Sequence, residues 1–214
     1  MTFLRSKLIN KLLVIIYLIL AGTSCAEDSF REESFYLKEL PGDFALGPKN
    51  APITIIEYSA LACRHCGIFH EKLFEEIKKN LIDTGKLRWV SRSFVSDSPS
   101  MRGSMLASCG DNDKYFLFQK ILFAKQTSWA YSTNFEEILK NIARLSGMSE
   151  VEFNKCMDNK AISDSLTRQR MIASKVLKLE GTPAFYMNGS KIKIDSYESF
   201  EALIANKMNE IEKK

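Results

Sequence analysis

The chain has 214 residues, 45% of them hydrophobic and 26% charged, values that are ordinary for a globular protein. This length allows one core with a subdomain inserted in it. The formal net charge of +4 falls to +1 without the three basic residues of the first 25, and no basic stripe with interleaved aromatic residues follows, so the sequence excludes nucleic acid as an expected partner.

Residues 1–26 have the layout of a secretory signal peptide. A basic start precedes an apolar run from Leu12 to Ala21, and small residues follow as far as Ala26. The apolar run is shorter than the roughly 20 residues of a membrane span, although an uncleaved membrane anchor is an alternative. We therefore expect an exported protein, which is either cleaved after Ala26 or anchored to a membrane through a lipid on Cys25.

An exported chain enters an oxidising compartment, where disulfides form and persist. The chain has five cysteines. Without Cys25, an even number remains, which suits two disulfides. These four residues are Cys63, Cys66, Cys109 and Cys156.

The first half of the chain predicts a parallel strand–helix–strand unit. Residues 27–50 are polar and are predicted to be a lead-in. The β-branched run at 53–60 predicts a buried strand. A helix is predicted from Arg64 to about Ile82, with Gly85 as its C-terminal cap. Residues 86–95 predict the next strand, and the short connections favour a βαβ unit.

A helical block of roughly 80 residues follows, because no strand pattern occurs between about Pro99 and Leu179. Ser149-x-x-Glu152 is a capping box, which marks a helix start. The stretches predicted to be helical are 101–109, 113–125, 134–146, 149–158 and 161–179.

Strands return near the C-terminus. Asn188-Gly189 separates the apolar runs 183–187 and 191–194, and this is the strongest short signal for a β-hairpin. An amphipathic helix is predicted from Ser196 to Lys214. We therefore predict an α/β domain formed by residues 51–97 and 180–214, with an all-helical domain inserted at residues 98–179.

Cys63 and Cys66 form a Cys-x-x-Cys motif where the first strand ends and its helix begins. A c-type haem needs a histidine directly after the second cysteine, where this chain has Gly67. A zinc site needs about four ligands. Cys63 and Cys66 with His70 give at most three, the only other histidine, His65, lies inside the loop, and the chain has no second Cys-x-x-Cys motif. A purely structural disulfide would close too short a loop to add much stability. The motif therefore predicts a redox-active disulfide, and no cofactor or metal beside it.

The position of Cys63 at a helix start explains why it would react. Backbone N–H groups and the helix dipole favour a thiolate there. Arg64 and His65 add donors or positive charge close to the sulfur. A stabilised thiolate stabilises the reduced dithiol, which makes the disulfide a stronger oxidant. Cys66, inside the first helical turn, is expected to be more buried and to resolve a mixed disulfide.

A second motif, Gly181-Thr182-Pro183, stands directly before a predicted strand. A trans proline is allowed at the first position of a strand, and a cis Thr182–Pro183 bond is the alternative. In the cis form the turn would bring Thr182 beside Cys63. Its backbone could then pair with a bound extended peptide, as in strand addition.

The sequence resembles the DsbA-like branch of the thioredoxin superfamily over nearly all of residues 50–210. The resemblance is carried by the segments EYSALACRHCGIFH, IDTGKLRWV and GTPAFYMNG and by the helical block. The resemblance implies an α/β thioredoxin fold with an inserted all-helical domain. It implies that Cys63 is the attacking cysteine, that Cys66 is the resolving one and that Pro183 is cis. It also implies disulfide exchange in the bacterial periplasm with unfolded exported proteins that carry free cysteines, and reoxidation by a membrane quinone-linked thiol oxidase.

Two positions depart from the best-known oxidases of this branch. Arg64 replaces a proline often found between the cysteines, and Thr182 stands where those oxidases often carry valine. Threonine is also common there in isomerase relatives. The leading hypothesis is a thiol oxidase, since residues 27–50 are too short for the dimerisation domain of such isomerases. The alternatives are an isomerase or reductase using the same site and a non-catalytic surface protein.

Three further expectations concern residues around the motif. The resemblance favours a structural disulfide between Cys109 and Cys156, with two inert thiols or a second redox pair as alternatives. Glu57 is an acid in an otherwise buried strand, so it either relays the proton of Cys66 or points to solvent. His70 shares a helix face with Cys66 and is expected to be packed or partly exposed.

Overall fold

The structure is a computed structural model that describes residues 31–213. The predicted signal peptide and Cys25 lie outside these residues. The chain divides after Tyr36 into two units. Residues 31–36 form a short helix in the first unit, and all that follows concerns the second. Within the described residues, no helix has the length and apolar character needed to cross a membrane.

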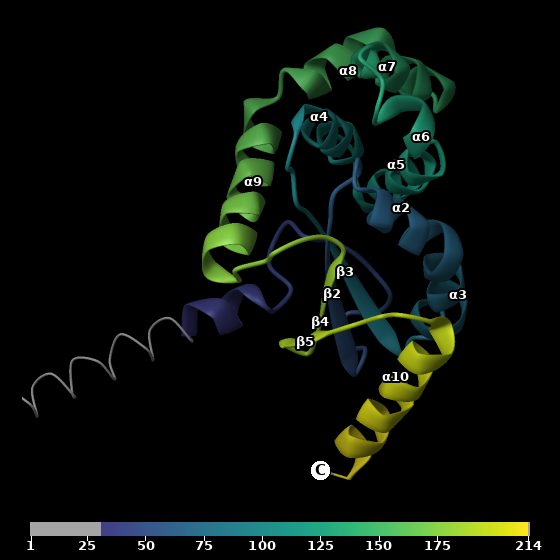
Figure 1. The fold of residues 1–214 in the computed structure, drawn as a ribbon, viewed down its shortest axis with the longest axis vertical. Coiled ribbons are helices and arrows are strands. Elements are labelled where there is room, and N and C mark those ends of the chain that lie inside the picture. Colours follow the sequence, from purple (N-terminus) through teal and green to yellow (C-terminus); the bar gives the residue numbers. More distant parts are fainter. Residues whose placement is uncertain (1–30, 214) are drawn as a thin grey trace, which may run out of the picture. The chain divides into compact units, whose positions relative to one another are not determined.

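The second unit is built on a five-stranded mixed sheet with the strand order β1-β3-β2-β4-β5 (Figure 1). The neighbours β2 and β3 run parallel, and the other adjacent pairs are antiparallel. The predicted βαβ unit is therefore confirmed, as is the hairpin at Asn188-Gly189, where both residues have positive φ. The strands are β1 (Phe44–Leu46), β2 (Ile53–Ser59), β3 (Leu87–Ser93), β4 (Ala184–Met187) and β5 (Ser190–Ile192).

The edge strand β1 corrects the prediction that residues 27–50 are only a lead-in. It pairs antiparallel with β3, from Phe44 opposite Ser91 to Leu46 opposite Trp89. Three residues are too short for a strand pattern to be recognised in a sequence. The ring of Phe44 stacks on Tyr115 of the helical block at a centroid distance of 4.0 Å, so contacts with distant residues hold β1 in place.

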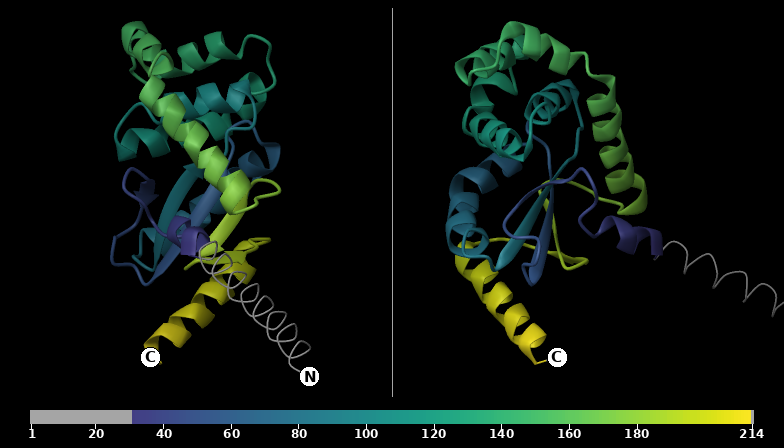
Figure 2. Two further views of the ribbon diagram at one scale, coloured as in Figure 1. Left: turned by 90° about the vertical axis from the view of Figure 1, so that its left-hand side faces the viewer. Right: turned by 180° about the vertical axis from the view of Figure 1, so that it is seen from behind.

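Helices cover both faces of the sheet. A continuous helix over residues 64–82 and α10 (Tyr197–Glu212) share one core with it, and Phe69, Ile77 and Phe200 from these helices are buried there beside Trp89. In the two views, α9 lies on the opposite side of the sheet from the helix of residues 64–82 (Figure 1 and Figure 2). The segments of the continuous helix are α2 (Arg64–Phe69), η1 (His70–Phe74), α3 (Glu75–Ile77) and η2 (Lys78–Ile82).

Between β3 and β4 the described chain is helical, as predicted. The inserted helices enclose a second core around Leu106, Leu122 and Trp129, and this core also includes Leu61 and Cys66 from the α/β part. The insertion therefore packs directly against the Cys-x-x-Cys segment. Its elements are α4 (Ser98–Ala107), α5 (Asn112–Ala124), α6 (Gln126–Trp129), α7 (Phe135–Leu145), α8 (Glu150–Met157), α9 (Lys160–Met171) and η3 (Ile172–Val176).

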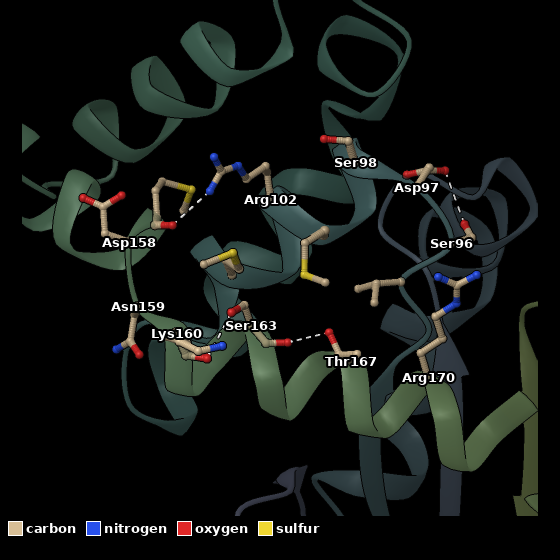
Figure 3. A pocket seen from close by; sticks show the side chains of 14 residues that line it. Ser96, Asp97, Ser98, Arg102, Asp158, Asn159, Lys160, Ser163, Thr167 and Arg170 are labelled. Carbon is tan, nitrogen blue, oxygen red and sulfur yellow. Dashed lines mark hydrogen bonds between the residues drawn. The ribbon is translucent and has the colours of Figure 1, made fainter.

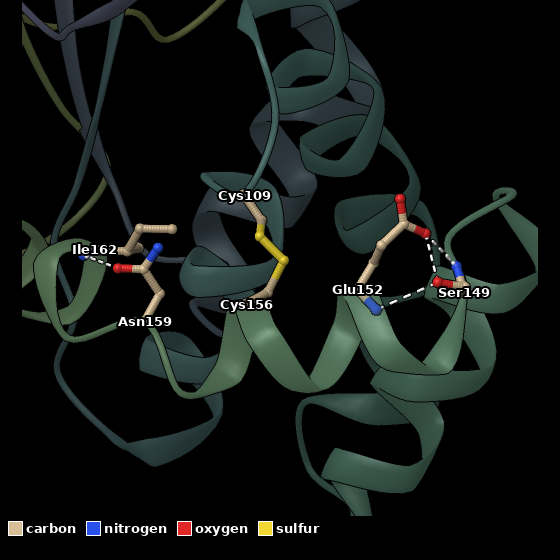
Figure 4. Close-up of a disulfide and its surroundings, with 6 residues drawn as sticks. All are labelled: Cys109, Ser149, Glu152, Cys156, Asn159 and Ile162. Carbon is tan, nitrogen blue, oxygen red and sulfur yellow. Dashed lines mark hydrogen bonds between the residues drawn. A yellow bond between two sulfur atoms is a disulfide. The ribbon is translucent and has the colours of Figure 1, made fainter.

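A disulfide joins Cys109, just after α4, to Cys156 in α8 (Figure 4). The two residues are 47 positions apart, and their Cα atoms lie 5.6 Å from each other. This is the pairing that the resemblance favoured. The predicted capping box is also present, since Ser149 accepts from the backbone N–H of Glu152 at 3.2 Å, while the Glu152 carboxylate accepts from the backbone N–H of Ser149 at 2.8 Å.

A buried ion pair ties the segment before β1 to the sheet. Arg92 of β3 donates to both carboxylate oxygens of Asp43, at 3.0 and 2.7 Å. It also donates to the hydroxyl of Tyr58 at 3.0 Å and to the carbonyl of Lys38 at 2.6 Å. Both charged side chains are almost fully buried. Removing one partner would leave the other charge unpaired inside the protein.

We predict that Asp43→Ala lowers the free energy of unfolding by about 3–5 kcal/mol, because the Arg92 guanidinium is then buried without its counter-ion. Urea denaturation measures the loss. Glu39→Ala is the control, since Glu39 pairs with Arg88 at 2.7 Å but is more exposed, and a pair of this kind contributes about 1 kcal/mol or less. Equal losses in the two variants would contradict the role given to burial.

Replacing Cys109 and Cys156 together by alanine is predicted to lower the free energy of unfolding by about 2–4 kcal/mol, because the disulfide no longer restricts the unfolded chain. Thiol–disulfide exchange at Cys63 is expected to persist in the same variant. Denaturation and exchange rates measured side by side check both expectations. An unchanged stability with lost exchange would instead identify this pair as a second redox centre.

Candidate redox site

Cys63 caps the N-terminus of α2, just beyond the end of β2. Its backbone is extended, with φ −76° and ψ 119°, and its side chain makes no capping hydrogen bond. Its carbonyl accepts from the N–H of Gly67 at 3.1 Å, which closes the first helical turn. The sulfur is half-buried, and it is not bonded to Cys66 in this structure. The predicted position at the helix start is therefore confirmed.

The surroundings of Cys63 favour a thiolate. They lower its pKa to about 5, chiefly because the thiol of Cys66 hydrogen-bonds to the sulfur. The side chain of Thr182 and the backbone N–H groups of Cys66 and His65 lower the pKa further, while partial burial opposes them. When protonated, the Cys63 thiol donates to the carbonyl of Thr182 at 3.3 Å. Hydrogen-bond donors to the thiolate lower the pKa of Cys63 by more than this one acceptor, which favours the protonated thiol, raises it.

Cys66 lies in the opposite environment, one turn into the helix. Its side chain is fully buried. Burial raises its pKa, and the nearby Cys63 raises it further. Two sulfur atoms three residues apart therefore have very different acidities. Such a pair combines an accessible, stabilised thiolate with a buried thiol that keeps its proton.

The Thr182–Pro183 peptide bond is cis, which settles the alternative that the sequence left open. The turn brings the Thr182 carbonyl against the Cys63 sulfur, although the two residues are 119 positions apart. Backbone groups beside a reactive sulfur are suited to holding an extended peptide. The roles of Thr182 and Pro183 in substrate binding remain predictions.

Arg64 and His65 are arranged differently from the prediction. Both side chains are exposed. In the part of the chain that the structure describes, neither side chain forms a hydrogen bond or an ion pair. The backbone N–H of His65, and not its imidazole, is among the groups that lower the pKa of Cys63. Both side chains thus stay available to an incoming peptide.

Glu57 points into the core, so the solvent-facing alternative is wrong. Its side chain is 0% exposed. One carboxylate oxygen lies 2.8 Å from Nε2 of His70, and the other accepts from the indole N–H of Trp89 at 3.1 Å. The relay of a proton from Cys66 to Glu57 remains a prediction.

Gln126 of α6 is a site residue that the sequence did not reveal. Its amide donates to the carbonyls of Leu61 at 2.7 Å and Cys63 at 2.9 Å, and thereby fixes the loop that carries the reactive sulfur. A Cβ at Gly67 would lie 2.6 Å from the Gln126 side-chain oxygen, so any larger residue there would require the Gln126 side chain to shift. The one signal available in the sequence was Gly67, directly after Cys66.

A separate cavity of about 500 Å³ lies between the start of α4 and helices α8 and α9 (Figure 3). Arg102 crosses it to donate to the carbonyl of Met157 at 2.9 Å. Neither cysteine of the motif lines this cavity. Over residues 31–213, no three His, Cys, Asp or Glu side chains gather in a way that could hold a metal ion.

The sequence and the fold are similar to those of known proteins. A family model described as thioredoxin matches residues 39–206. A putative protein-disulfide oxidoreductase of Rickettsia bellii is 33% identical over 173 residues, which cover 80% of this chain and 67% of that protein. Disulfide bond formation protein D of Bacillus subtilis is 25% identical over 162 residues, which cover 72% of this chain and 71% of that protein.

Among solved structures, alpha-DsbA1 of Wolbachia pipientis superimposes with a TM-score of 0.77 and 32% sequence identity. The match covers 83% of this chain and 96% of that one. The chain spans 55% to 67% of the length of its Rickettsia relatives.

We predict that the Cys63 thiolate of the reduced protein titrates with a midpoint near pH 5 and that Thr182→Val raises this midpoint, because the valine cannot donate to the sulfur. Ultraviolet absorbance of the thiolate measures the midpoint. Thr182→Ser keeps a hydroxyl and serves as the control. A valine variant with the wild-type midpoint would show that the hydroxyl has no effect on the thiolate.

The same depressed pKa sets the pH dependence of stability. Because the folded pKa lies below the unfolded value of about 8.5, the thiolate stabilises the reduced fold fully above about pH 8.5. This contribution is lost as the pH falls through about 5. Thermal unfolding of reduced and oxidised protein across this range should show the reduced form gaining stability relative to the oxidised form as the pH rises. Parallel curves would contradict the assignment.

Proposed function

Because the chain belongs to the thioredoxin family, in its DsbA-like branch, we propose that it is an exported protein-disulfide oxidoreductase that introduces disulfides into folding proteins. The predicted thioredoxin fold with an inserted helical domain is the fold of this branch. The observation that carries the proposal is the contrast between Cys63, whose pKa is about 5, and the buried Cys66.

The difference in acidity between Cys63 and Cys66 determines how the disulfide passes from this protein to the substrate. A substrate thiolate attacks the Cys63 sulfur of the Cys63–Cys66 disulfide, and Cys66 leaves as a thiolate that takes up a proton. A second substrate thiolate then attacks the substrate sulfur of the mixed disulfide. Cys63 leaves readily because its low pKa makes it a stable thiolate. The substrate gains a disulfide, and the protein keeps two reduced cysteines.

The cis turn supports an unfolded peptide as the substrate. The Thr182 carbonyl lies 3.3 Å from the Cys63 sulfur. An extended segment that pairs with this turn would bring its own cysteine to the same place, through backbone contacts that do not depend on sequence. We therefore expect the clients to be unfolded exported proteins with free cysteines.

The proposed cellular setting is the bacterial periplasm. The support is the signal-peptide layout of residues 1–26, with a lipid on Cys25 as the alternative ending. Each turnover leaves Cys63 and Cys66 reduced, so an electron acceptor is needed. A membrane quinone-linked thiol oxidase is the proposed reoxidant, and the family resemblance is its only support.

An isomerase or reductase is the second candidate, and the hydroxyl of Thr182 favours it. This hydroxyl stabilises the thiolate, and isomerisation starts with a thiolate attacking a wrong disulfide. A non-catalytic surface protein is the third. The accessible Cys63 beside a buried Cys66 argues against it, because such a pair has no evident structural use.

The discriminating experiment compares two substrates. The oxidised protein is incubated with a fully reduced multi-disulfide enzyme, and the reduced protein with a scrambled form of the same enzyme. We expect activity to return from the reduced form and little from the scrambled form. Efficient rescue of the scrambled form would identify an isomerase, and exchange with neither would favour the non-catalytic protein.

We predict that Cys63→Ser abolishes oxidation of the reduced substrate, because the attacked sulfur is gone, while the fold is kept. Cys66→Ser is also expected to lose this oxidation, because its single thiol holds no disulfide to pass on. With the scrambled substrate, its Cys63 thiolate is expected to attack a substrate disulfide, release one substrate thiolate and stay joined to the other sulfur as a mixed disulfide, which non-reducing electrophoresis detects. A Cys63→Ser variant with normal activity would overturn the proposed mechanism.

A further inference from the structure

The turn that carries Cys63 is held by side chains of the helical insertion. Residues 60–63, which join β2 to α2, are called here the reactive turn. The N–H of Cys63 donates to the carbonyl of Ala60 at 2.9 Å and closes this turn. Three successive carbonyls of the turn accept hydrogen bonds from side chains of the insertion, namely those of Leu61, Ala62 and Cys63.

Gln126 makes two of these three bonds with one buried amide. Its Nε2 lies 2.7 Å from the carbonyl oxygen of Leu61 and 2.9 Å from that of Cys63. The third bond, from the hydroxyl of Tyr131 to Ala62, is longer at 3.4 Å, and Tyr131 is 59% exposed, so water can take its place. Gln126 and Leu61 are each 5% exposed, which leaves water little access to their contact. The reactive turn therefore depends mainly on Gln126.

Gly67 shows that the redox helix has room for this amide. Glycine weakens a helix relative to alanine, and Gly67 does not have the positive φ that would require glycine. What it provides is space, since a Cβ there would lie 2.6 Å from Oε1 and 3.1 Å from Nε2 of Gln126. The N–H of Gly67 also donates to the carbonyl of Cys63 at 3.1 Å. Gln126 and Gly67 thus hold the same carbonyl group.

The helix that carries Gln126 is itself anchored in the insertion. Trp129 of α6 is fully buried, and its indole donates to the carbonyl of Leu122 in α5 at 2.8 Å. The same ring packs against Gly103 of α4, where a Cβ would lie 2.8 Å from it. The position of α6 against α4 and α5 therefore determines where the Gln126 amide meets the reactive turn.

The reactivity of Cys63 depends on the geometry of its donors. Among the described residues, the groups that lower its pKa most are hydrogen-bond donors rather than charged side chains: the thiol of Cys66, the side chain of Thr182 and the backbone N–H groups of Cys66 and His65. Hydrogen bonds weaken steeply as their distances and angles depart from the optimum. A movement of the reactive turn relative to α2 would take the sulfur away from these donors.

We propose that Gln126 is a positioning residue for Cys63: by holding the carbonyls of Leu61 and Cys63, it keeps the sulfur facing the N–H groups at the start of α2 and so sets how strongly the Cys63–Cys66 disulfide oxidises a thiol. The proposal deepens the function proposed above, since it rests on exchange at these two cysteines. It assigns part of the oxidising strength to a residue of the insertion, 63 positions away from Cys63.

The equilibrium with glutathione reports this property without a client. Two glutathione thiolates give two electrons to the Cys63–Cys66 disulfide and become glutathione disulfide. At neutral pH, Cys63 is left as a thiolate, whereas Cys66 takes up one proton from the solvent. A change that weakens the Cys63 thiolate therefore shifts the equilibrium toward the protein disulfide and makes the protein a weaker oxidant.

The first test replaces the amide. Gln126→Met keeps a long side chain but cannot donate to the two carbonyls. We expect the midpoint of the Cys63 titration, followed by thiolate absorbance, to rise from near pH 5 by about one pH unit, roughly what one hydrogen bond to a charged group contributes. The glutathione equilibrium at neutral pH should then shift about tenfold toward the disulfide. An unchanged midpoint and equilibrium would overturn the proposal.

Gln119→Met is the matched control. Gln119 is another glutamine of the insertion, 2% exposed, and its amide donates at 2.7 Å to the hydroxyl of Ser91 in β3 rather than to the reactive turn. Urea denaturation should show a loss of stability in both variants, because each loses a buried hydrogen bond. Only Gln126→Met is expected to shift the midpoint and the equilibrium. Equal shifts in the two variants would mean that Gln126 acts on stability alone, which contradicts the proposal.

A second route disturbs the same contact from the redox helix. In Gly67→Ala the new Cβ displaces the Gln126 amide, so the midpoint should rise even though alanine favours the helix. In a Gln126→Ala background no amide is left to displace, so adding Gly67→Ala should shift the midpoint little further. Additive shifts, or a more stable Gly67→Ala protein with the wild-type midpoint, would contradict the direct contact.

These measurements are independent of the client. Failure to oxidise or to rescue any protein substrate would overturn the proposed function, while the midpoint and the glutathione equilibrium would still report the effect of Gln126. Conversely, a protein that oxidises its clients but is unaffected by Gln126→Met would overturn this inference alone.

Discussion

The chemistry of this protein depends on two sulfur atoms that lie three residues apart and have unequal surroundings. Cys63 stands before the first helical turn, where donors converge on it and the cis turn at Thr182 closes one side. Cys66 stands within that turn and is fully buried. So large a difference in solvation over three residues requires packed side chains that exclude water from Cys66 and leave Cys63 accessible. Much of the fold provides this packing.

The helical insertion provides part of the packing that buries Cys66. Leu61 and Cys66 share a core with Leu106, Leu122 and Trp129, so the desolvation of Cys66 comes largely from residues 40 or more positions away. Gln126 then ties the backbone of the reactive loop to the insertion. The insertion therefore acts on the redox pair directly, in addition to any role in binding clients.

A buried carboxylate is paired on each face of the sheet. Side chains alternate along a strand, so Glu57 with Trp89 and Tyr58 with Arg92 point to opposite sides. The Arg92–Asp43 pair anchors the segment before β1 and has many donors with matching acceptors, as a structural ion pair requires. On the other face, the Glu57 carboxylate lies 2.8 Å from Nε2 of His70 and accepts from the indole of Trp89.

Local sequence patterns were enough to predict the βαβ unit, the helical block, the Asn188-Gly189 hairpin and the position of Cys63 at a helix start. Each of these features depends on hydrophobic periodicity or backbone preferences over a few neighbouring residues, and both can be recognised in the sequence alone. Four features became visible only in the folded chain: the cis turn beside Cys63, the pairing of β1, the contact of Gln126 and the direction in which Glu57 points. These depend on residues 32 to 119 positions apart, and on which side chains exclude water from a given atom. Burial is a property of the packed chain as a whole, so a local pattern could single out Cys66, Glu57 and His70 without showing that all three side chains are buried.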